Sequence, residues 1–373
     1  MESPYLTDPE ELGSLLDSEP SYRVEQLSEW LYKTPVATAE EMTNLPGSIR
    51  EAIGDNLWPF KVEALQRSDG GDTVKWLFRM PDGPAIEAVL MGYPRRTTLC
   101  ISSQAGCALG CTFCATGQFG FERYLNAGEI VAQVQWAEAY LRAGGMPGSP
   151  SRVTNIVYMG MGEPLVNYRN IRESLRRLID VRGMGARRIT VSTVGVAPAM
   201  KRLADEPWQV GLAVSLHAGD DDLRDELVPL NQRYDLEEVE AAAAYFFEKT
   251  GRRVSIEWTM IKGRNDTLDQ AAKLARIARR LSAHVNLIAM NPTPLSSDQP
   301  SSDHVIKRFE SELDALGVNA TVRHIRGKSI DAACGQLRAA ENGKQGLQIK
   351  TSTGPQGRRT LSSAYNLVSE EIG

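Results

Sequence analysis

The chain has 373 residues, of which 42% are hydrophobic and 24% charged, a balance that excludes a protein disordered throughout. Its formal net charge of −5 excludes a uniformly basic surface, so contacts with nucleic acid must come from local basic patches. No apolar stretch approaches the roughly 20 residues that span a bilayer, and Met1-Glu2-Ser3-Pro4 does not resemble a signal peptide, so we expect a cytoplasmic protein without a membrane segment.

The first part of the chain predicts a small helical module followed by a β-hairpin. Apolar residues recur at helical spacing within residues 23–32. Two strand-like runs, at 74–80 and 85–91, are separated by a short turn sequence. We therefore expect a helical accessory domain over residues 1–73 and a hairpin linker over residues 74–95.

From residue 97 onward, strand-like and helical patterns alternate. The apolar, strand-like runs are 97–102, 155–159, 188–192, 210–216, 254–261, 284–290 and 320–325. The helical patterns between them include 129–141, 171–181, 236–249, 267–281 and 303–316. Strands that alternate with helices predict parallel βαβ units. The number of these units, together with the absence of a dinucleotide-binding glycine motif from the sequence, indicates an α/β protein with a full or partial (β/α) barrel over residues 96–338. Residues 339–373 are polar, and we expect a flexible tail there.

Three of the five cysteines form a C-x3-C-x2-C set, Cys107, Cys111 and Cys114, directly after the first predicted barrel strand. An odd number of cysteines favours metal binding or redox chemistry over a disulfide scaffold. Three thiolates can hold one face of a cubane iron–sulfur cluster and leave its fourth iron open for a small molecule such as S-adenosylmethionine (SAM). A structural zinc site with Cys100 as fourth ligand is the alternative, which this spacing fits poorly.

Polar residues and glycines stand where several predicted strands end. The turn at residues 160–164 contains Gly162 and Glu163, whose carboxylate can bind an amino group. Residues at later strand ends are Ser192, Ser215, Leu216, His217 and Asn291. Because the carboxyl ends of barrel strands meet on one face, these residues together predict one ligand pocket. Each of them alone is equally consistent with a cap or loop residue.

These motifs resemble the family of radical SAM RNA adenine methyltransferases that includes RlmN and Cfr. The resemblance extends from about residue 22 to residue 337 and is carried by the segments 22–32, 42–46, 100–107, 159–165, 215–217 and 331–337. It implies a barrel of the radical SAM type, with SAM and a [4Fe–4S] cluster as cofactors. The cluster ligands that it implies are Cys107, Cys111 and Cys114. The SAM-binding residues that it implies are Gly162, Glu163, Ser192, Ser215, Leu216, His217 and Asn291.

The resemblance also gives roles to the two remaining cysteines. Carbon 2 of adenine is electrophilic and cannot attack the methyl group of SAM, so a radical route is needed. In the family, Cys334 takes a methyl group from one SAM, and a second SAM gives the radical that removes hydrogen from that methyl group before it joins the ring. Cys100 then releases the product by forming a disulfide with Cys334, and Glu87 accepts a proton. From the residues alone, a buried structural thiol is the alternative for Cys100 and for Cys334, where Gly335 and Gln336 make it less plausible, and Glu87 could equally be a solvent-facing carboxylate.

The resemblance further implies the partners. We expect methylation of adenine carbon 2 in 23S ribosomal RNA and in transfer RNA, RNA binding by the N-terminal module, and an electron donor such as flavodoxin or ferredoxin. Methylation of carbon 8, as by Cfr, uses the same cysteines, and a noncatalytic iron–sulfur or zinc RNA-binding protein is the alternative of another class. We expect a monomer, and among the basic clusters Arg95-Arg96 and Arg358-Arg359 as phosphate contacts.

Overall fold

The computed structural model describes residues 1–337 apart from 17–18, 294, 324–326 and 334. Cys334, Arg358-Arg359 and the expected tail at 339–373 therefore lie outside the described residues. No helix in the described part of the chain is both long enough and apolar enough to cross a membrane.

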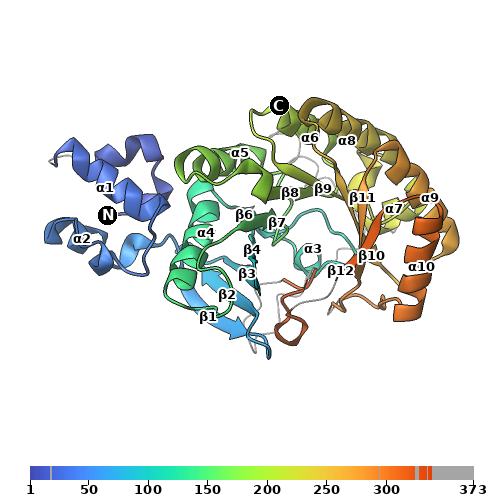
Figure 1. Ribbon diagram of the computed structural model, residues 1–373, viewed down its shortest axis with the longest axis horizontal. Coiled ribbons are helices and arrows are strands. Elements are labelled where there is room, and N and C mark those ends of the chain that lie inside the picture. The colour runs from blue at the N-terminus through green and yellow to red at the C-terminus, as the bar shows by residue number, and fades with distance from the viewer. Residues whose placement is uncertain (17–18, 294, 324–326, 334, 338–373) are drawn as a thin grey trace, which may run out of the picture.

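A large curved sheet forms the centre of the molecule (Figure 1). Its order is β1-β2-β3-β4-β7-β8-β9-β10-β11-β12. The strands are β1 (Lys61–Arg67), β2 (Thr73–Arg79), β3 (Ala85–Tyr93), β4 (Arg96–Cys100), β7 (Asn155–Tyr158), β8 (Ile189–Thr193), β9 (Gly211–Ser215), β10 (Ser255–Met260), β11 (His284–Ala289) and β12 (Ala320–Arg323). From β4 to β12 every neighbouring pair is parallel, whereas β1 to β4 pair antiparallel. The predicted α/β fold is confirmed, and the open, curved run of parallel strands agrees with the partial rather than the full barrel.

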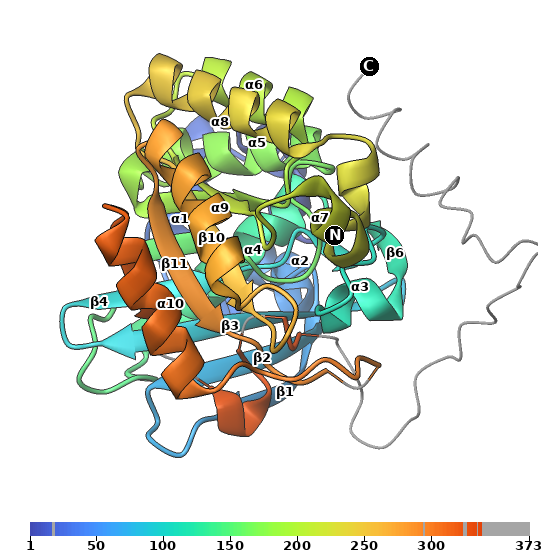
Figure 2. The same ribbon diagram turned by 90° about the vertical axis from the view of Figure 1, so that its right-hand side faces the viewer.

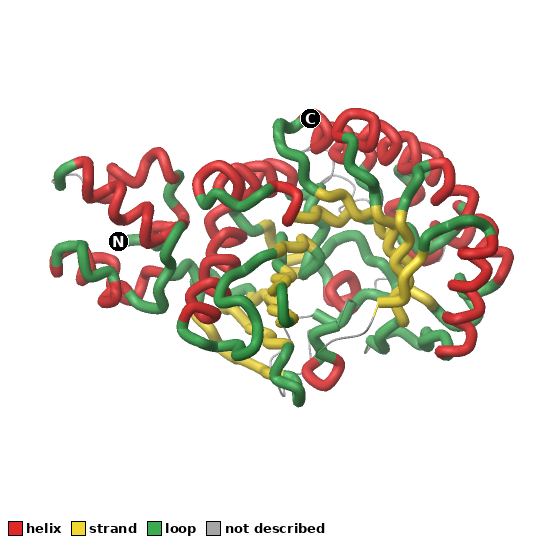
Figure 3. Tube along the Cα trace, in the orientation of Figure 1, coloured by secondary structure: helices red, strands yellow, loops and turns green. Residues whose placement is uncertain are grey.

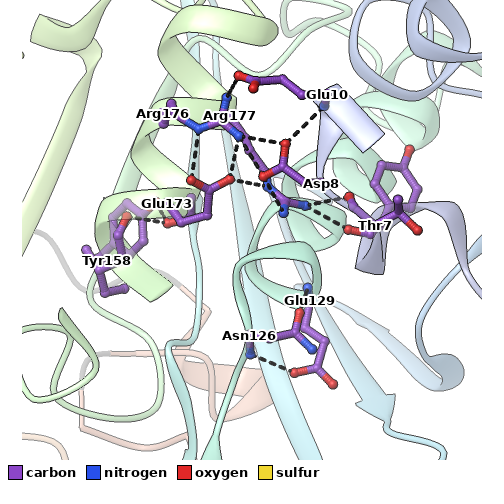
Figure 4. Close-up of polar contacts among 12 residues, drawn as sticks. Thr7, Asp8, Glu10, Asn126, Glu129, Tyr158, Glu173, Arg176 and Arg177 are labelled. Carbon is purple, nitrogen blue, oxygen red and sulfur yellow. Dashed lines mark hydrogen bonds and ion pairs between the residues drawn. The ribbon is translucent and has the colours of Figure 1, made fainter. Parts of the chain in front are cut away.

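Helices cover the outer, convex side of the parallel strands (Figures 2 and 3). They are α4 (Ala127–Arg142), α5 (Tyr168–Arg176), α6 (Ala197–Asp205), α7 (Asp221–Leu227), α8 (Leu236–Thr250), α9 (Leu268–Arg280) and α10 (Asp303–Ala315), and short turns lie at Arg177–Val181, Ala186–Arg188, Pro229–Gln232 and Lys328–Ile330. Local sequence fixes several helix starts. Asn126 accepts a hydrogen bond from the Glu129 backbone while the Glu129 carboxylate accepts one from the Asn126 backbone, a capping box that begins α4 (Figure 4).

The N-terminal segment is helical, as the periodicity predicts, and lies to one side of the sheet (Figure 1). Its helices are α1 (Ser21–Tyr32) and α2 (Gly47–Ile53), with short 3-10 turns at Pro4–Leu6, Pro9–Leu16, Ala39–Glu41 and Gly54–Leu57. The indole of Trp58 stacks on Tyr5 with ring centroids 5.2 Å apart and meets Trp136 of α4 edge-on at 5.1 Å. Aromatic packing thus joins this segment to the barrel.

A buried arginine also holds the N-terminal segment in place (Figure 4). Arg177, at the end of α5, is 5% exposed and donates hydrogen bonds to the backbone carbonyls of Tyr5 and Thr7. Its Nε also donates to Glu173 at 2.7 Å. The neighbouring Arg176 pairs with Asp8 at 2.8 Å. A pair of arginines that belongs to a basic cluster in the sequence is therefore occupied by internal contacts.

Strands β2 and β3 form the predicted hairpin, in register from Thr73↔Met91 to Arg79↔Ala85. Strand β1 was not predicted, because the sequence analysis included its residues in the helical module. It is an edge strand whose apolar side chains are exposed, Val62 by 37% and Leu65 by 45%, and its register shifts between Val62 and Ala64. Without a buried face, it lacks the alternating apolar pattern by which strands are recognised.

Candidate active site

The cysteine loop lies between a small ribbon and a short helix. Strands β5 (Gln104–Gly106) and β6 (Phe121–Tyr124) pair with each other, and α3 (Ala115–Phe119) begins directly after Cys114. The loop is anchored at both ends, because the Cys107 N–H donates to Gly120 O at 2.8 Å and the Cys114 N–H donates to Cys111 O at 3.2 Å. Backbone hydrogen bonds therefore set the path of the loop.

A cavity with about 150 Å³ of enclosed space opens beside this loop. The predicted site residues that line it are Cys107, Cys111, Cys114, Gly162, Glu163, Ser192, Ser215, His217 and Asn291. The fold thus brings residues from the cysteine loop and from several strand ends to one cavity. Leu216 does not line it and is only 1% exposed within the core.

Glycine is required where the chain turns into the cavity after β7. A Cβ atom on Gly160 would lie 2.6 Å from the carbonyl carbon and oxygen of Ile101 and 2.8 Å from the Ser102 nitrogen, all of them backbone atoms. At Gly162, φ is +97° and a Cβ would approach the Gln104 side chain to 2.5 Å. The turn therefore packs directly on the segment that leads to the cysteines.

Glu163 spans two strand ends. Its Oε1 accepts from the Leu165 N–H at 3.0 Å and its Oε2 from the Val194 N–H at 2.9 Å, after β8. Burial raises the pKa of this carboxyl to about 7, against the lowering effect of those two backbone hydrogen bonds. The carboxylate is therefore fixed in orientation while it lines the cavity.

His217 has an unusual backbone and a defined tautomer. Its φ of +63° is in the left-handed region, which a histidine seldom adopts. Nδ1 accepts from the Thr259 N–H at 3.0 Å, which places the ring proton on Nε2. Burial, followed by the charge of Arg224, lowers the pKa of the imidazole to about 3. The ring meets Phe113 edge-on at 4.6 Å, so it also contacts the cysteine loop.

Behind the cavity, Arg224 of α7 connects three segments. It is fully buried, and its Nε donates to the Leu216 carbonyl at 3.1 Å. Nη1 donates to Asn231 Oδ1 at 2.6 Å, and Nη2 donates to the Val194 carbonyl. Leu216 and Val194 adjoin the cavity residues His217 and Thr193. Arg224 thus fixes the ends of β8 and β9 relative to each other.

The three cysteines of the loop provide the donor atoms that an iron–sulfur cluster requires. Cys111 is buried and the other two are partly buried. Burial raises the pKa of the Cys107 thiol to about 12 and that of Cys111 well above its ordinary value. The described residues contain no group of three His, Cys, Asp or Glu side chains gathered closely enough to hold a single metal ion. Three separate thiols on the wall of one cavity are the donor set that a cubane cluster with one open iron requires.

Two of the predicted catalytic residues, Cys100 and Glu87, do not line this cavity. Cys100 ends β4 in register with Val89 and Val157 and is 8% exposed. Glu87 of β3 is 5% exposed, so it is not a solvent-facing carboxylate. It forms an ion pair of 2.8 Å with Lys75 of β2. Cys334 lies outside the described residues.

The residues on either side of Cys334 contact both the cysteine loop and the hairpin. The Ala115 N–H donates to Gly335 O at 2.8 Å, and Thr116 Oγ1 donates to Leu337 O at 2.6 Å, both at the start of α3. On the hairpin, Lys75 Nζ donates to Asp331 O at 3.2 Å. The described parts of this segment thus bridge α3 and β2.

Sequence reasoning missed Glu257, which also lines the cavity. Strand β10 carries Ser255, Glu257 and Thr259 alternately with apolar residues. A strand in the middle of a helix-covered parallel sheet is expected to be apolar on both faces. The alternation of polar side chains along residues 255–259 was therefore the signal that this strand faces a ligand site.

Comparisons with known proteins agree with this architecture. A model of the radical SAM superfamily matches residues 101–275. A relative from Rhodococcus erythropolis, named probable dual-specificity RNA methyltransferase RlmN, is 49% identical over 332 residues, which are 87% of this chain and 90% of the relative. A relative of the same name from Chloroflexus aurantiacus is 46% identical and covers 88% of this chain and 90% of its own length. The crystal structure of a radical SAM methyltransferase from Sphaerobacter thermophilus superposes with a TM-score of 0.86 at 48% identity, over 91% of this chain and all of that one.

The partial barrel, the cysteine loop at its mouth and the superfamily match define a radical SAM enzyme. Its cofactors are accordingly SAM and a [4Fe–4S] cluster. At nearly half identity over most of both chains, this chain belongs to the RlmN family of radical SAM RNA methyltransferases.

Proposed function

We propose that this protein methylates carbon 2 of an adenine in 23S ribosomal RNA, and also in transfer RNA, with two SAM per turnover and a methylated Cys334 as intermediate. The observation that carries the proposal is the single cavity that gathers Cys107, Cys111 and Cys114 with Gly162 and Glu163. Family membership supports an RNA substrate, and the relatives' printed name, dual-specificity RNA methyltransferase, supports more than one substrate.

In this proposal the three cysteines of the loop hold the cluster. Glu163, with its carboxylate fixed by Leu165 and Val194, receives the amino group of SAM, and Gly162 lets the backbone approach the ligand. The remaining SAM-binding residues are Ser192, Ser215, His217 and Asn291, which line the cavity. Leu216 is proposed with them as the core residue that lies between Ser215 and His217. When bound, the cluster and SAM supply the methyl group and the radical chemistry.

Three residues of this chain carry the methyl transfer. The sulfur of Cys334 receives a methyl group from one SAM, and after one hydrogen atom is removed from it, that carbon joins adenine carbon 2. The adduct gives up one electron, which returns to the electron-transfer chain that supplied the electron for SAM cleavage, and Glu87 accepts the proton that leaves the ring. The thiolate of Cys100 then attacks the sulfur of Cys334, which breaks the bond between that sulfur and the methylene carbon and forms a disulfide. The carbon keeps the electron pair of the broken bond and takes up a proton, which makes it the methyl group. An electron donor of the flavodoxin or ferredoxin kind supplies the electron for SAM cleavage and the two electrons that reduce the disulfide before the next turnover.

Contacts with RNA are proposed at the turn between β3 and β4. Arg95 and Arg96 are both exposed there, and the Arg96 guanidinium lies 4.3 Å from the ring centroid of Tyr93. A guanidinium that stacks on an aromatic ring keeps its outward N–H groups for phosphate. Methylation needs access to the edge of the base. The target adenine therefore has to be flipped out of its helix or lie in an unpaired segment of the RNA.

The test is anaerobic reconstitution of the full-length protein, incubation with SAM, reductant and either 23S ribosomal RNA or transfer RNA, and mass spectrometry of the methylated adenosines. The expected product is 2-methyladenosine from both RNAs. Formation of 8-methyladenosine instead would assign the Cfr-type reaction to this protein.

Two variants separate SAM cleavage from methyl transfer. Cys111→Ala should lose SAM cleavage altogether, whereas Cys334→Ala should retain SAM cleavage but form no methylated RNA. If Cys334→Ala methylated RNA at the wild-type rate, the intermediate proposed here would be wrong. If wild-type protein bound RNA but never cleaved SAM, a noncatalytic RNA-binding protein would be the better description.

A further inference from the structure

One carboxylate oxygen in the cavity is left without a partner. Glu257 of β10 is 2% exposed and lines the cavity. Its Oε1 accepts from Asn286 Nδ2 at 2.9 Å and from Arg323 Nη2 at 3.3 Å. Its Oε2 is shielded from solvent and has no hydrogen-bond partner among residues 1–337 as far as they are described. Oε1 is therefore held by donors of the protein, and Oε2 can accept a hydrogen bond from a ligand.

Strand register places this side chain in a polar row. Glu257 is paired with Ser215 on β9 and with Asn286 on β11. Paired residues of parallel strands project from the same face of a sheet, so these three side chains share the face that lines the cavity. Ser215 Oγ lies 3.5 Å from Ser192 Oγ on β8, which extends the row by one strand. Glu257 thus stands among residues already assigned to SAM.

The free oxygen calls for a donor from outside the protein. A buried carboxylate oxygen without a hydrogen bond is destabilising, and native proteins satisfy nearly all such atoms. Burial raises the pKa of Glu257, while Arg323, Asn286 and Ser255 oppose that rise. Asn286 and Arg323 both donate to Oε1, and the positively charged guanidinium favours the ionised carboxylate. An ionised carboxylate only accepts hydrogen bonds, so the partner that Oε2 calls for is a hydroxyl or an amino group.

We propose that Glu257 binds the ligand in this cavity. Its Oε2 accepts a hydrogen bond from the adenosine part of SAM, through a ribose hydroxyl. Acidic side chains bind ribose hydroxyls in other nucleotide sites because a carboxylate and a sugar diol are complementary. The target adenosine of the RNA also has ribose hydroxyls and is therefore the second possible donor to Oε2. This inference rests on the proposed function only in that the same cavity takes SAM.

Glu257→Gln tests the proposal because the surrounding donors dictate how glutamine must sit. Asn286 and Arg323 both donate, so the glutamine carbonyl has to occupy the place of Oε1 and its NH₂ group the place of Oε2. The variant keeps the shape of the side chain but turns the acceptor that faces the ligand into a donor. The dissociation constant for SAM, measured by calorimetry on the cluster-reconstituted protein without RNA, should rise at least tenfold.

Glu138→Gln is the matched control. Glu138 of α4 is 6% exposed and pairs with Arg182 at 2.7 Å, but it does not line the cavity. Its replacement makes the same chemical change at a buried carboxylate elsewhere, and SAM affinity should stay at the wild-type value. Circular dichroism and thermal melting of both variants establish that they are folded.

The outcomes separate this inference from the proposed function. If wild-type protein binds SAM and Glu257→Gln binds it equally well while the KM for RNA rises tenfold, the donor belongs to the target adenosine. If SAM affinity and the KM for RNA are both unchanged, the proposal is overturned although the proposed function stands. If wild-type protein itself does not bind SAM, both are overturned. Should Glu257→Gln not fold, Glu257→Asp, which keeps the charge but withdraws the oxygens, has to weaken SAM binding or RNA binding for the proposal to stand.

Discussion

Lys75 Nζ lies 2.8 Å from Glu87 Oε1, and the two side chains are only 9% and 6% exposed. The pair joins β2 to β3, where Lys75 is opposite Val89 and Glu87 is opposite Leu77. Lys75 also donates to the carbonyl of Asp331. The carboxylate proposed to accept the ring proton is therefore held by a lysine that also contacts the segment leading to Cys334.

Replacing Lys75 by methionine should strongly destabilise the protein, because it removes the lysine that pairs with the buried Glu87 carboxylate. We expect a loss of about 3 kcal/mol in the free energy of unfolding, measured by urea denaturation. In Lys75→Met/Glu87→Gln at least half of that loss should be recovered. Lys273→Met, which removes a lysine from partly exposed ion pairs with Asp220 and Asp269, is the control and should leave stability unchanged within error. Equal losses for the single and the double variant would mean that Lys75 acts through Asp331 alone.

Gly160→Ala should disrupt the turn after β7. The added Cβ would meet backbone atoms of Ile101 and Ser102 at 2.6 to 2.8 Å, and backbone cannot rotate away as a side chain can. We expect a loss of about 2 kcal/mol in unfolding free energy together with weaker SAM binding. Gly185→Ala is the matched control, because nothing lies within 4 Å of a Cβ there. A Gly160→Ala protein as stable as Gly185→Ala would show that the turn moves freely.

Features that depend on local spacing could be predicted from the sequence. The cysteine loop, the hairpin and the glycine turn are each defined by a few neighbouring residues, and the cavity contains all three loop cysteines together with Gly162 and Glu163. Features that depend on pairing between distant strands could not. Glu257 acquires its place from Ser215 on one side and Asn286 on the other, and neither partner can be read from the residues around it.

Buried charged side chains are the second class of feature that could not be predicted from the sequence. Arg224 lies in the acidic stretch Asp220–Glu226, where an arginine is expected to be a solvated helix residue. Instead it is fully buried, because carbonyl groups from two strand ends turn toward it. Arg177 is a similar case, since two of its partners are backbone carbonyls near the start of the sequence, Tyr5 and Thr7. Only the folded chain creates such acceptors.

The low pKa of His217 predicts how the stability of the protein depends on pH. Its folded pKa of about 3 lies below the ordinary value of 6.5, so the unfolded chain binds more protons between these limits. The contribution of His217 to stability is therefore complete above pH 6.5 and is lost as the pH falls toward 3. The contribution of Glu163 to the pH dependence of stability has the opposite sign. Its pKa is raised to about 7, so the folded chain binds more protons and becomes more stable as the pH falls. Comparison of wild type with His217→Gln isolates the histidine.

Urea denaturation of both proteins at about pH 7.5 and pH 5 measures this contribution. On lowering the pH, wild type should lose about 2 kcal/mol relative to His217→Gln, as expected for a single histidine with these two pKa values. Glutamine is suited to the comparison because its side-chain oxygen can accept from the Thr259 N–H as Nδ1 does. Parallel changes in the two proteins would mean that His217 is protonated in the folded state near its ordinary pKa.

Arg224→Met should weaken both the fold and the ligand site. The methionine fills much of the space but leaves the carbonyls of Leu216 and Val194 without their donor, and we expect a loss of about 3 kcal/mol in unfolding free energy. SAM affinity should fall as well, because those carbonyls hold the ends of β9 and β8, where His217 and Thr193 line the cavity. Arg280→Met, at a side chain that is 65% exposed, is the control and should change neither quantity. A loss of stability with unchanged SAM affinity would mean that the two strand ends keep their positions without Arg224, and that its contacts serve the core alone.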